Sequence, residues 1–123
     1  MYPADRRYTK DHEWITVNGT HGRVGITDYA QKQLGDVVFV ELPEVGRGVT
    51  QGQAAGTIES VKAVSELFSP VSGKVINVNP TLASKPETVN KDPHGTWLFD
   101  IELSSPGEVD TLLTSDQYAE FVK

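Results

Sequence analysis

Cysteine is missing from this 123-residue sequence, so neither a disulfide nor a thiolate metal site can form. Basic residues are also few, because 11 lysines and arginines stand against 17 aspartates and glutamates, for a net charge of −6. A nucleic-acid surface needs a basic patch, and this charge balance argues against one. The negative charge instead favours solubility and partners with basic surfaces. No apolar run approaches the length of a membrane-spanning helix, so we expect no membrane partner.

Catalytic motifs are equally scarce. No serine stands in a Gly-x-Ser-x-Gly turn, and the chain offers no recognisable nucleophile. The separations of His12, His21 and His94 match no zinc pattern, so we interpret these histidines as scattered surface residues rather than metal ligands. We therefore expect no metal site and no nucleophile for catalysis.

The length suits one domain spanning residues 1–123, which can bury about two thirds of its unfolded surface. Its first seven residues contain no apolar stretch, so they do not form a secretory signal, and they are too few for a usual transit peptide. From these features we expect a cytoplasmic protein of bacterial type.

Alternating and β-branched segments predict a β-rich fold with short helices at its edges. The expected strands cover residues 14–17, 23–26, 37–40, 73–78 and 97–103, with a short strand inside 44–53. We expect Asn18-Gly19 to form a hairpin turn because both residues tolerate positive φ. The apolar run 37–40 indicates a well-buried strand, and Phe99, Ile101 and Leu103 should share one face of theirs.

Helix signals are local and short. Thr27 can cap a helix over residues 28–34, and Gly35 can end it. A helical turn is expected at 81–84, followed by an extended loop to residue 95. Capping-box patterns with Glu108 and Gln117 predict two further helices near the C-terminus. The last of them should pack Tyr118, Phe121 and Val122 on one face.

The segment 56–70 has Lys62 at its centre, with small or apolar neighbours and carboxylates at Glu59 and Glu66. Its apolar residues recur at helical spacing, and several are good helix formers. A hairpin with strands 54–59 and 64–69 and a turn over 60–63 is the competing structure, although neither Asn-Gly nor Asp-Gly is present to set the turn. Local physics alone favours the helix.

The string Glu59-Ser-Val-Lys-Ala-Val-Ser65 resembles the lipoyl-attachment segment of the glycine cleavage system H-protein family. Five further blocks resemble that family in order and spacing: residues 8–14, 24–31, 34–43, 69–73 and 97–99. Together they cover roughly residues 8–122, and six ordered blocks are a specific signal. In that family the lysine lies at the tip of a β-hairpin. The resemblance therefore favours the hairpin.

The resemblance implies a mainly β fold, a flattened barrel or sandwich of two small antiparallel sheets with a few short helices. It further implies a single, monomeric lipoyl-carrier domain with lipoate in amide linkage on Lys62, attached by a lipoyl- or octanoyl-transferring enzyme. The carrier would take the aminomethyl group from glycine decarboxylase (P protein) to the aminomethyltransferase (T protein). Dihydrolipoyl dehydrogenase (L protein) would then reoxidise it. The resemblance thus implies a carrier that is not an enzyme, in which the chemistry is that of the cofactor.

Several other residues take roles from the same resemblance. The modifying enzyme would recognise the residues around the lysine, namely Glu59, Ser60, Val61, Ala63, Val64, Ser65 and Glu66. Glu13 matches a position that lines the cleft for the loaded arm, where a carboxylate could bind the cationic amino group. A solvated residue at the start of a strand is the alternative interpretation of Glu13. The chain departs from the family at Gln33, where several members have histidine, and at residues 93–97, where it is one residue shorter.

Other carriers are the alternatives. A biotin carrier shares the hairpin but normally has methionine on both sides of the lysine, and the single methionine here is Met1. A lipoyl domain of a 2-oxoacid dehydrogenase would normally adjoin linkers and further domains. An H-like protein that serves only lipoate relay, and a plain binding module with an unmodified lysine, also remain open.

Overall fold

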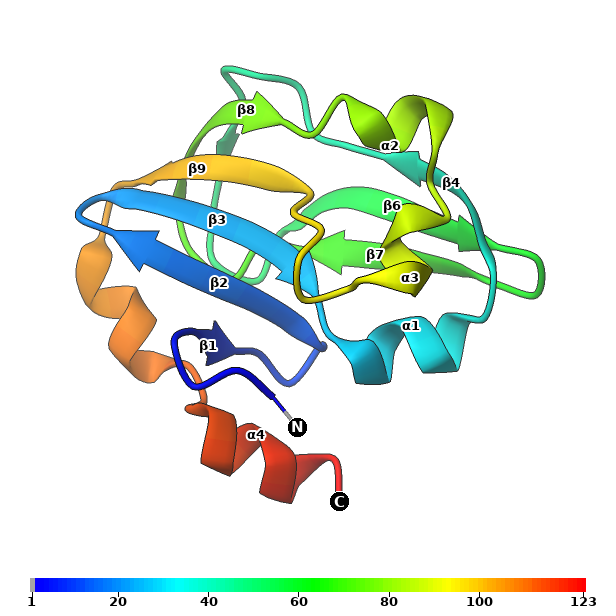
Figure 1. Ribbon diagram of the computed structural model, residues 1–123. Helices are drawn as coiled ribbons and strands as arrows, with labels where there is room; N and C mark the ends of the chain where they lie inside the picture. Colours follow the sequence, from blue (N-terminus) through cyan, green and yellow to red (C-terminus); the bar gives the residue numbers. More distant parts are fainter. Residues whose placement is uncertain (1) are drawn as a thin grey trace.

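The computed structural model describes residues 2–123 and shows two antiparallel β-sheets stacked as an open sandwich (Figure 1). The larger sheet has six strands, in the spatial order β1 (Arg7–Tyr8), β2 (Glu13–Asn18), β3 (His21–Ile26), β9 (Phe99–Leu103), β8 (Gly73–Val78) and β5 (Gly48–Val49). The smaller sheet has three, in the order β4 (Val37–Glu41), β6 (Ala54–Ser60) and β7 (Val64–Phe68). The predicted fold class is confirmed.

Short helices lie at the margins of the sandwich. They are α1 (Asp28–Leu34), α2 (Thr81–Ser84), α3 (Thr88–Lys91), the 3-10 segment η1 (Pro106–Thr111) and α4 (Ser115–Phe121). Helix α4 lies against the N-terminal segment, away from the tip of the β6–β7 hairpin (Figure 1). Among these helices of residues 2–123, none is both long and apolar enough to cross a membrane.

The β2–β3 hairpin forms as predicted, but its turn lies one residue later than expected. Asn18 pairs with His21, so the two turn residues are Gly19 and Thr20. Of these two, only Gly19 has a positive φ, +66°. A glycine with positive φ at the first turn position, followed by an ordinary second residue, is the pattern of a type II′ turn. The expectation that Asn18 itself would adopt positive φ was therefore wrong.

Helix α1 begins and ends as the sequence predicts. The Thr27 hydroxyl accepts a hydrogen bond from the Ala30 N–H, which satisfies one of the unpaired amides of the first turn. Gly35 ends the helix with φ +76° and donates its N–H to the Gln31 carbonyl. This conformation favours glycine, so the chain can turn from α1 directly into β4.

Strand β4 is less buried than its apolar sequence predicts. Val37 and Val40 face the core, but Val38 and Phe39 are 49% and 53% exposed. The cause is a β-bulge: Val37 pairs with Ser60 and Phe39 pairs with the adjacent Glu59, so Val38 is an extra residue. A bulge breaks the strict alternation of side chains, and here it leaves two consecutive apolar side chains facing solvent.

The second half of the chain departs from expectation at two places. Helix α3 occupies the stretch that was predicted to be an extended loop. The segment after Ser105 is a 3-10 helix without a side-chain cap, because the Glu108 carboxylate instead accepts hydrogen bonds from the N–H and hydroxyl of Ser72. The capping box of α4 is confirmed, with reciprocal bonds between Thr114 and Gln117. Tyr118 is buried and Val122 packs against its cluster, as predicted, but Phe121 is 46% exposed.

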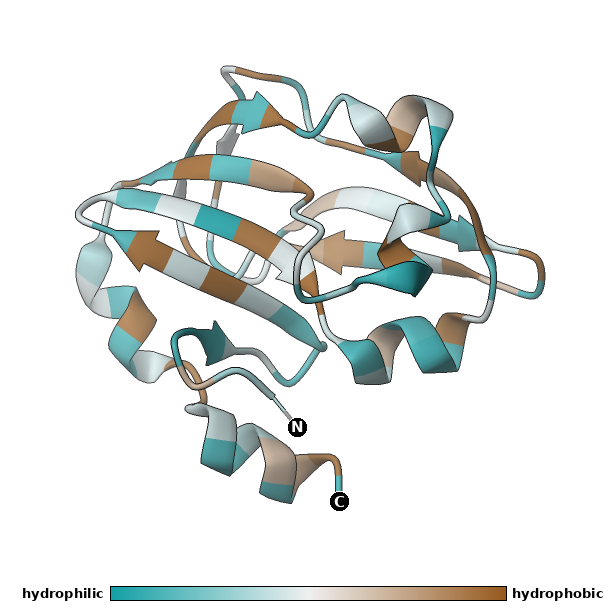
Figure 2. Ribbon diagram, in the orientation of Figure 1, coloured by the Kyte–Doolittle hydropathy of each residue, from teal (hydrophilic) through white to brown (hydrophobic). Residues whose placement is uncertain are grey.

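The main hydrophobic core lies between the two sheets. Phe99, Ile101 and Leu103 of β9 all face it, as predicted, and Figure 2 shows apolar and polar residues alternating along this strand. A second cluster forms around Tyr8, Trp14 and Tyr118, where α4 closes the end of the larger sheet. Burying this apolar surface provides the main stabilisation of the sandwich.

Gly56 of β6 gives a direct test of the packing between strands. A Cβ at Gly56 would overlap the Glu41 carbonyl oxygen of β4, whereas a Cβ at Gly48 of β5 would meet nothing within 4 Å. We predict that Gly56→Ala lowers the free energy of unfolding by about 2 kcal/mol, as overpacking does. Gly48→Ala should change it by no more than about 0.5 kcal/mol. Urea unfolding measures both, and equal effects would contradict the described approach of β4 to β6.

Candidate functional site

Lys62 lies at the tip of the β6–β7 hairpin, which confirms the hairpin over the helix. The Ser60 N–H donates to the Ala63 carbonyl (2.8 Å). The N–H groups of Lys62 and Ala63 donate to the Ser60 hydroxyl at 3.3 and 3.1 Å. The Val61 N–H donates to the Asp36 carbonyl (3.0 Å) and so ties the tip to the residues before β4. Hydrogen bonds from one serine thus take the place of the absent Asn-Gly signal.

The Lys62 side chain is exposed and extends across the end of α1. A Cβ added to Gly35 would lie 3.4 Å from Lys62 Cε. At that distance a Cβ would make an ordinary van der Waals contact, so Gly35 is needed here for its positive φ rather than for space. The aliphatic part of Lys62 lies against the end of α1.

A cleft of about 290 Å³ opens beside this hairpin. Its walls come from the hairpin (residues 63–67), from α1 (Ala30, Gln33 and Leu34) and from residues 11–13 at the start of β2. The lining begins at the residue directly after Lys62. A group attached to Lys62 could therefore fold back along β7 into the cleft.

Glu13 is the charged group held most deeply in the cleft, with only 2% of its surface exposed. Its carboxylate accepts hydrogen bonds from the Thr9 hydroxyl (2.6 Å) and the Phe68 N–H (3.3 Å). Burial raises the pKa of Glu13 to about 7, although these two hydrogen bonds act to lower it. The alternative of a solvated residue is excluded by this burial.

Strand β7 turns one side of its backbone toward the cleft. The Ser69 N–H donates to the Gln53 carbonyl, on the side of β6, whereas the Phe68 N–H donates to Glu13. Because backbone groups alternate in direction along a strand, those of Glu66 point to the same side as those of Phe68. Glu66 also lines the cleft. The cleft therefore combines a buried carboxylate with the backbone groups of an edge strand.

His12 is not a free surface residue, as the sequence had suggested. Its Nδ1 lies 2.7 Å from the Tyr118 hydroxyl, which lies 2.8 Å from the Thr27 hydroxyl. Its backbone has φ +71°, which is uncommon for a residue with a side chain. Burial lowers the pKa of the His12 imidazole. His12 thus links the cleft wall to α4 and to the first turn of α1.

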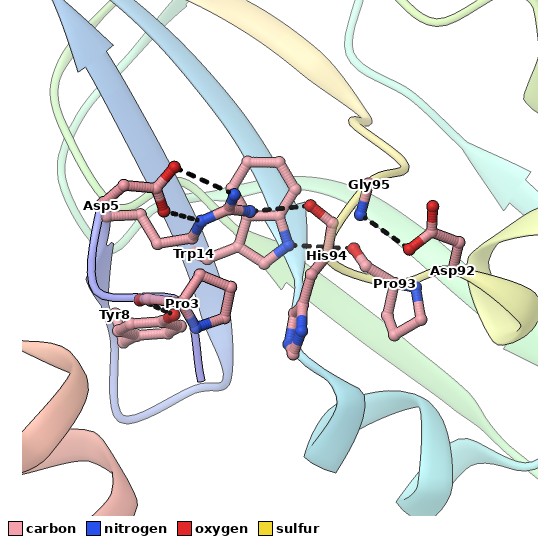
Figure 3. Close-up of polar contacts among 9 residues, drawn as sticks. Pro3, Asp5, Tyr8, Trp14, Asp92, Pro93, His94 and Gly95 are labelled. Atoms are coloured by element: carbon pink, nitrogen blue, oxygen red, sulfur yellow. Dashed lines mark hydrogen bonds and ion pairs between the residues drawn. The ribbon is translucent and has the colours of Figure 1, made fainter. Parts of the chain in front are cut away.

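The two departures from the family pattern fall in different places. Gln33 lines the cleft, so its amide replaces an imidazole there. The segment 93–97 lies elsewhere, held on the N-terminal residues: the Trp14 indole N–H donates to the Pro93 carbonyl (3.1 Å) and Arg6 donates to the His94 carbonyl (2.7 Å) (Figure 3). The His94 ring accepts from the Asp28 N–H, so this histidine too is bound rather than free.

The residues predicted to surround the lysine divide into two groups. Ser60 is only 6% exposed and forms the turn. The others are exposed and accessible to another protein: Glu59, Val61, Ala63, Val64, Ser65 and Glu66. Sequence reasoning missed Thr9 and Phe68 as the hydrogen-bond partners of Glu13. The contact with Thr9 depends on the conformation of the loop before β2. The contact with Phe68 depends on how the two sheets stack.

Among residues 2–123, no group of histidine and carboxylate side chains is arranged to hold a metal ion. The site combines an exposed amine at the hairpin tip with a buried carboxylate in the cleft beside it. An exposed amine can accept an acyl group, and the neighbouring cleft has room for an attached arm.

Comparison with known proteins identifies the arrangement. Residues 6–123 match the family described as glycine cleavage H-protein. The chain belongs to that family. It is 56% identical to the glycine cleavage system H protein of Koribacter versatilis, over 98% of this chain and 93% of the relative. It is 57% identical to the one from Symbiobacterium thermophilum, over 98% and 95%. The crystal structure of an H protein from Mycobacterium marinum aligns with a TM-score of 0.89 at 44% identity, covering 97% of each chain.

Family membership settles the class of function. Glycine cleavage H proteins carry lipoate covalently on a lysine and are non-catalytic subunits. This chain is accordingly a lipoyl carrier of the glycine cleavage system, working with the other components of that system. A biotin carrier is excluded by the same match.

The raised pKa of Glu13 predicts a specific dependence of stability on pH. The folded chain binds the Glu13 proton more tightly than the unfolded chain does, because the pKa of a glutamate in the unfolded chain has its ordinary value of 4.5. The free energy of unfolding should therefore fall as the pH rises from 4.5 to about 7, by about 3 kcal/mol. Glu13→Gln cannot ionise and should lack this fall.

Urea unfolding of both proteins between pH 4 and about 8.5 isolates the effect, because other carboxylates contribute equally to both. The variant should gain stability relative to the original protein across this window. A difference that stays constant with pH would show that Glu13 is ionised as easily in the folded chain as in the unfolded one.

Proposed function

We propose that Lys62 is the lysine that bears lipoate and that residues 1–123 act as one carrier domain. The observation that carries this proposal is the position of Lys62 at the exposed tip of a hairpin that borders the cleft. None of the other lysines among residues 2–123 lies in this hairpin or lines the cleft. Lys62 is also the lysine within the segment that resembles the attachment motif.

The site fits the group chemically. The amine must attack the carbonyl carbon of an activated lipoyl or octanoyl donor, such as an acyl adenylate or an acyl thioester. The C–N bond forms, the bond to the leaving group breaks with its electron pair, and the amine proton passes to water. An exposed Lys62 with the small neighbour Ala63 leaves the access that this attack requires. When bound, lipoate would supply a dithiolane able to accept the aminomethyl group, and Lys62 would hold it by the amide bond.

We propose three enzymes as the partners that visit this arm: P protein loads the aminomethyl group, T protein removes its carbon, and L protein restores the disulfide. We place this cycle in the bacterial cytoplasm, because the last two steps need tetrahydrofolate and NAD. Net charge −6 supports contact with basic partner surfaces. The exposed residues Glu59, Val61 and Glu66 belong to the surface that an enzyme meets around Lys62.

The cleft serves to shelter the loaded arm. The amino group of the loaded arm is cationic, and the carboxylate of Glu13 is buried in the cleft. Ionised Glu13 would form a charge-assisted hydrogen bond with that ammonium, and the approaching cation would favour the ionised form. Exclusion of water would protect the labile aminomethyl group. A carboxylate in the cleft is consistent with a loaded, cationic arm, and this supports the full glycine cleavage role.

Lys62→Arg tests the attachment site. The charge is retained and the side chain stays exposed, so the free energy of unfolding should change by no more than about 0.5 kcal/mol. A guanidinium remains protonated and offers no free amine. We predict that the variant folds, accepts no lipoyl group and supports no glycine cleavage with P, T and L proteins, as measured by intact mass and by release of CO2 from glycine.

The matched control is Lys74→Arg, on an exposed position of β8 outside the motif. It should be lipoylated and should support glycine cleavage like the original protein. Aminomethyl transfer by Lys62→Arg would place the attachment site elsewhere. Unfolding of Lys62→Arg would instead give Lys62 a structural role and contradict the proposal.

A further inference from the structure

The bulge in β4 directs apolar side chains to solvent close to the tip of the lysine hairpin. Val38 and Phe39 are 49% and 53% exposed, and on the hairpin itself Val61 and Val64 are 69% and 68% exposed. Bulges are found next to functional sites, where they re-aim side chains. A contiguous group of exposed apolar side chains, unlike scattered single ones, marks an interaction surface.

The strand register places two of these residues, Phe39 and Val64, on one face. Phe39 of β4 pairs with Glu59 of β6, and Glu59 pairs with Val64 of β7. Directly paired residues project to the same side of a sheet, so Phe39, Glu59 and Val64 form a row across the outer face of the smaller sheet. With Val38 and Val61 we call the four apolar residues of this region the apolar strip. Two of its residues lie in the hairpin that holds Lys62, and two lie on β4, which pairs with that hairpin.

Carboxylates surround the apolar strip. Two residues along the strands, the next outward row pairs Glu41 with Thr57 and Thr57 with Glu66. Glu41, Glu59 and Glu66 are all exposed, and none forms an ion pair within the described residues 2–123. An apolar row bordered by unpaired carboxylates is complementary to an apolar groove bordered by lysine or arginine.

The position of the strip indicates which partner covers it. An enzyme that acts on the sulfur atoms works at the far end of the arm and can dock at a distance from Lys62. The enzyme that attaches the acyl group must bring its active site to Nζ itself, at the root of the arm. Its contact surface therefore has to include the outer face of the sheet immediately beside the hairpin tip. This consideration rests on Lys62 as the attachment site.

We propose that the apolar strip and its carboxylates are the docking surface for the enzyme that acylates Lys62. Phe39 and Val38 extend this surface beyond the attachment segment to a strand more than twenty positions earlier in the sequence. The partner presents an apolar groove with a basic border. The attachment segment alone, moved to a flat hairpin without β4, would accordingly be a poor substrate.

Phe39→Ser tests the docking surface, because it removes the largest side chain of the strip without touching the hairpin. The matched control is Phe121→Ser, which removes a phenylalanine of similar exposure (46%) from α4, away from the hairpin tip (Figure 1). Apo forms of both variants and of the original protein are acylated by lipoate–protein ligase with lipoate and ATP. We expect Phe39→Ser to raise the KM for the apo carrier about tenfold with kcat retained, the effect of removing one interface anchor. Phe121→Ser should stay within about twofold of the original protein.

Charge is tested separately with Glu41→Lys, and Glu120→Lys on α4 is its control. Glu41→Lys should raise the KM and weaken its dependence on salt, whereas Glu120→Lys should do neither. Thermal unfolding of each variant establishes that it is folded before acylation is measured.

The outcomes separate this inference from the proposed function. If the original protein is acylated on Lys62 and Phe39→Ser has an unchanged KM, the docking surface is wrong while the attachment site stands. If acylation is unchanged but the loaded variant exchanges CO2 more slowly with P protein, the strip serves the decarboxylase and the assignment to the acylating enzyme is wrong. If sedimentation shows that only Phe39→Ser abolishes a dimer, the occupant is a second copy of the chain. Failure of the original protein to be acylated on Lys62 would contradict the proposed function itself.

Discussion

The hydroxyl of Ser60 holds the turn on which the function of this carrier depends. It accepts the N–H groups of Lys62 and Ala63 and donates to the Ala63 carbonyl at 3.2 Å. The turn has no residue with positive φ, so it does not use the mirror-image geometry of most two-residue hairpins. The hydroxyl of the buried Ser60 instead bonds to turn backbone groups that would otherwise lack a hydrogen-bond partner. Lys62 is thereby fixed at an exposed position while the strands on either side continue into the core.

The second constraint is the contact between the two sheets beside that hairpin. Glu13 belongs to the larger sheet and accepts from the Phe68 N–H of the smaller one. The same carboxylate therefore fixes the outer edge of β7 and provides the charged group of the cleft. A buried carboxylate is costly unless it is hydrogen-bonded, and its raised pKa expresses the remaining cost. Such a residue is suited to bind a cationic group, because a nearby ammonium would offset part of the desolvation cost of the ionised carboxylate.

Sequence reasoning predicted most of the fold because strong local signals agree with the tertiary structure. The Thr27 cap, Gly35 and the Thr114–Gln117 capping box each act within a few residues, and each is confirmed. It went wrong where a distant partner overrides the local pattern. Glu108 bonds to Ser72 instead of closing a capping box, and the bulge at Val38 exposes a strand that looked buried. The hairpin around Lys62 came from the resemblance alone, because the local pattern favoured a helix.

The cleft was accessible to sequence reasoning only in part. Glu13 was predicted through the family, but its bond to Phe68 joins residues 55 positions apart and depends on how the sheets stack. The central claim is that Lys62 alone carries the cofactor, and intact-mass measurement with peptide mapping tests it most directly on protein from a host that synthesises lipoate. The account predicts a single lipoyl or octanoyl group, located on Lys62 and on none of the other six lysines. A lipoyl group on another lysine, or biotin on Lys62, would contradict it.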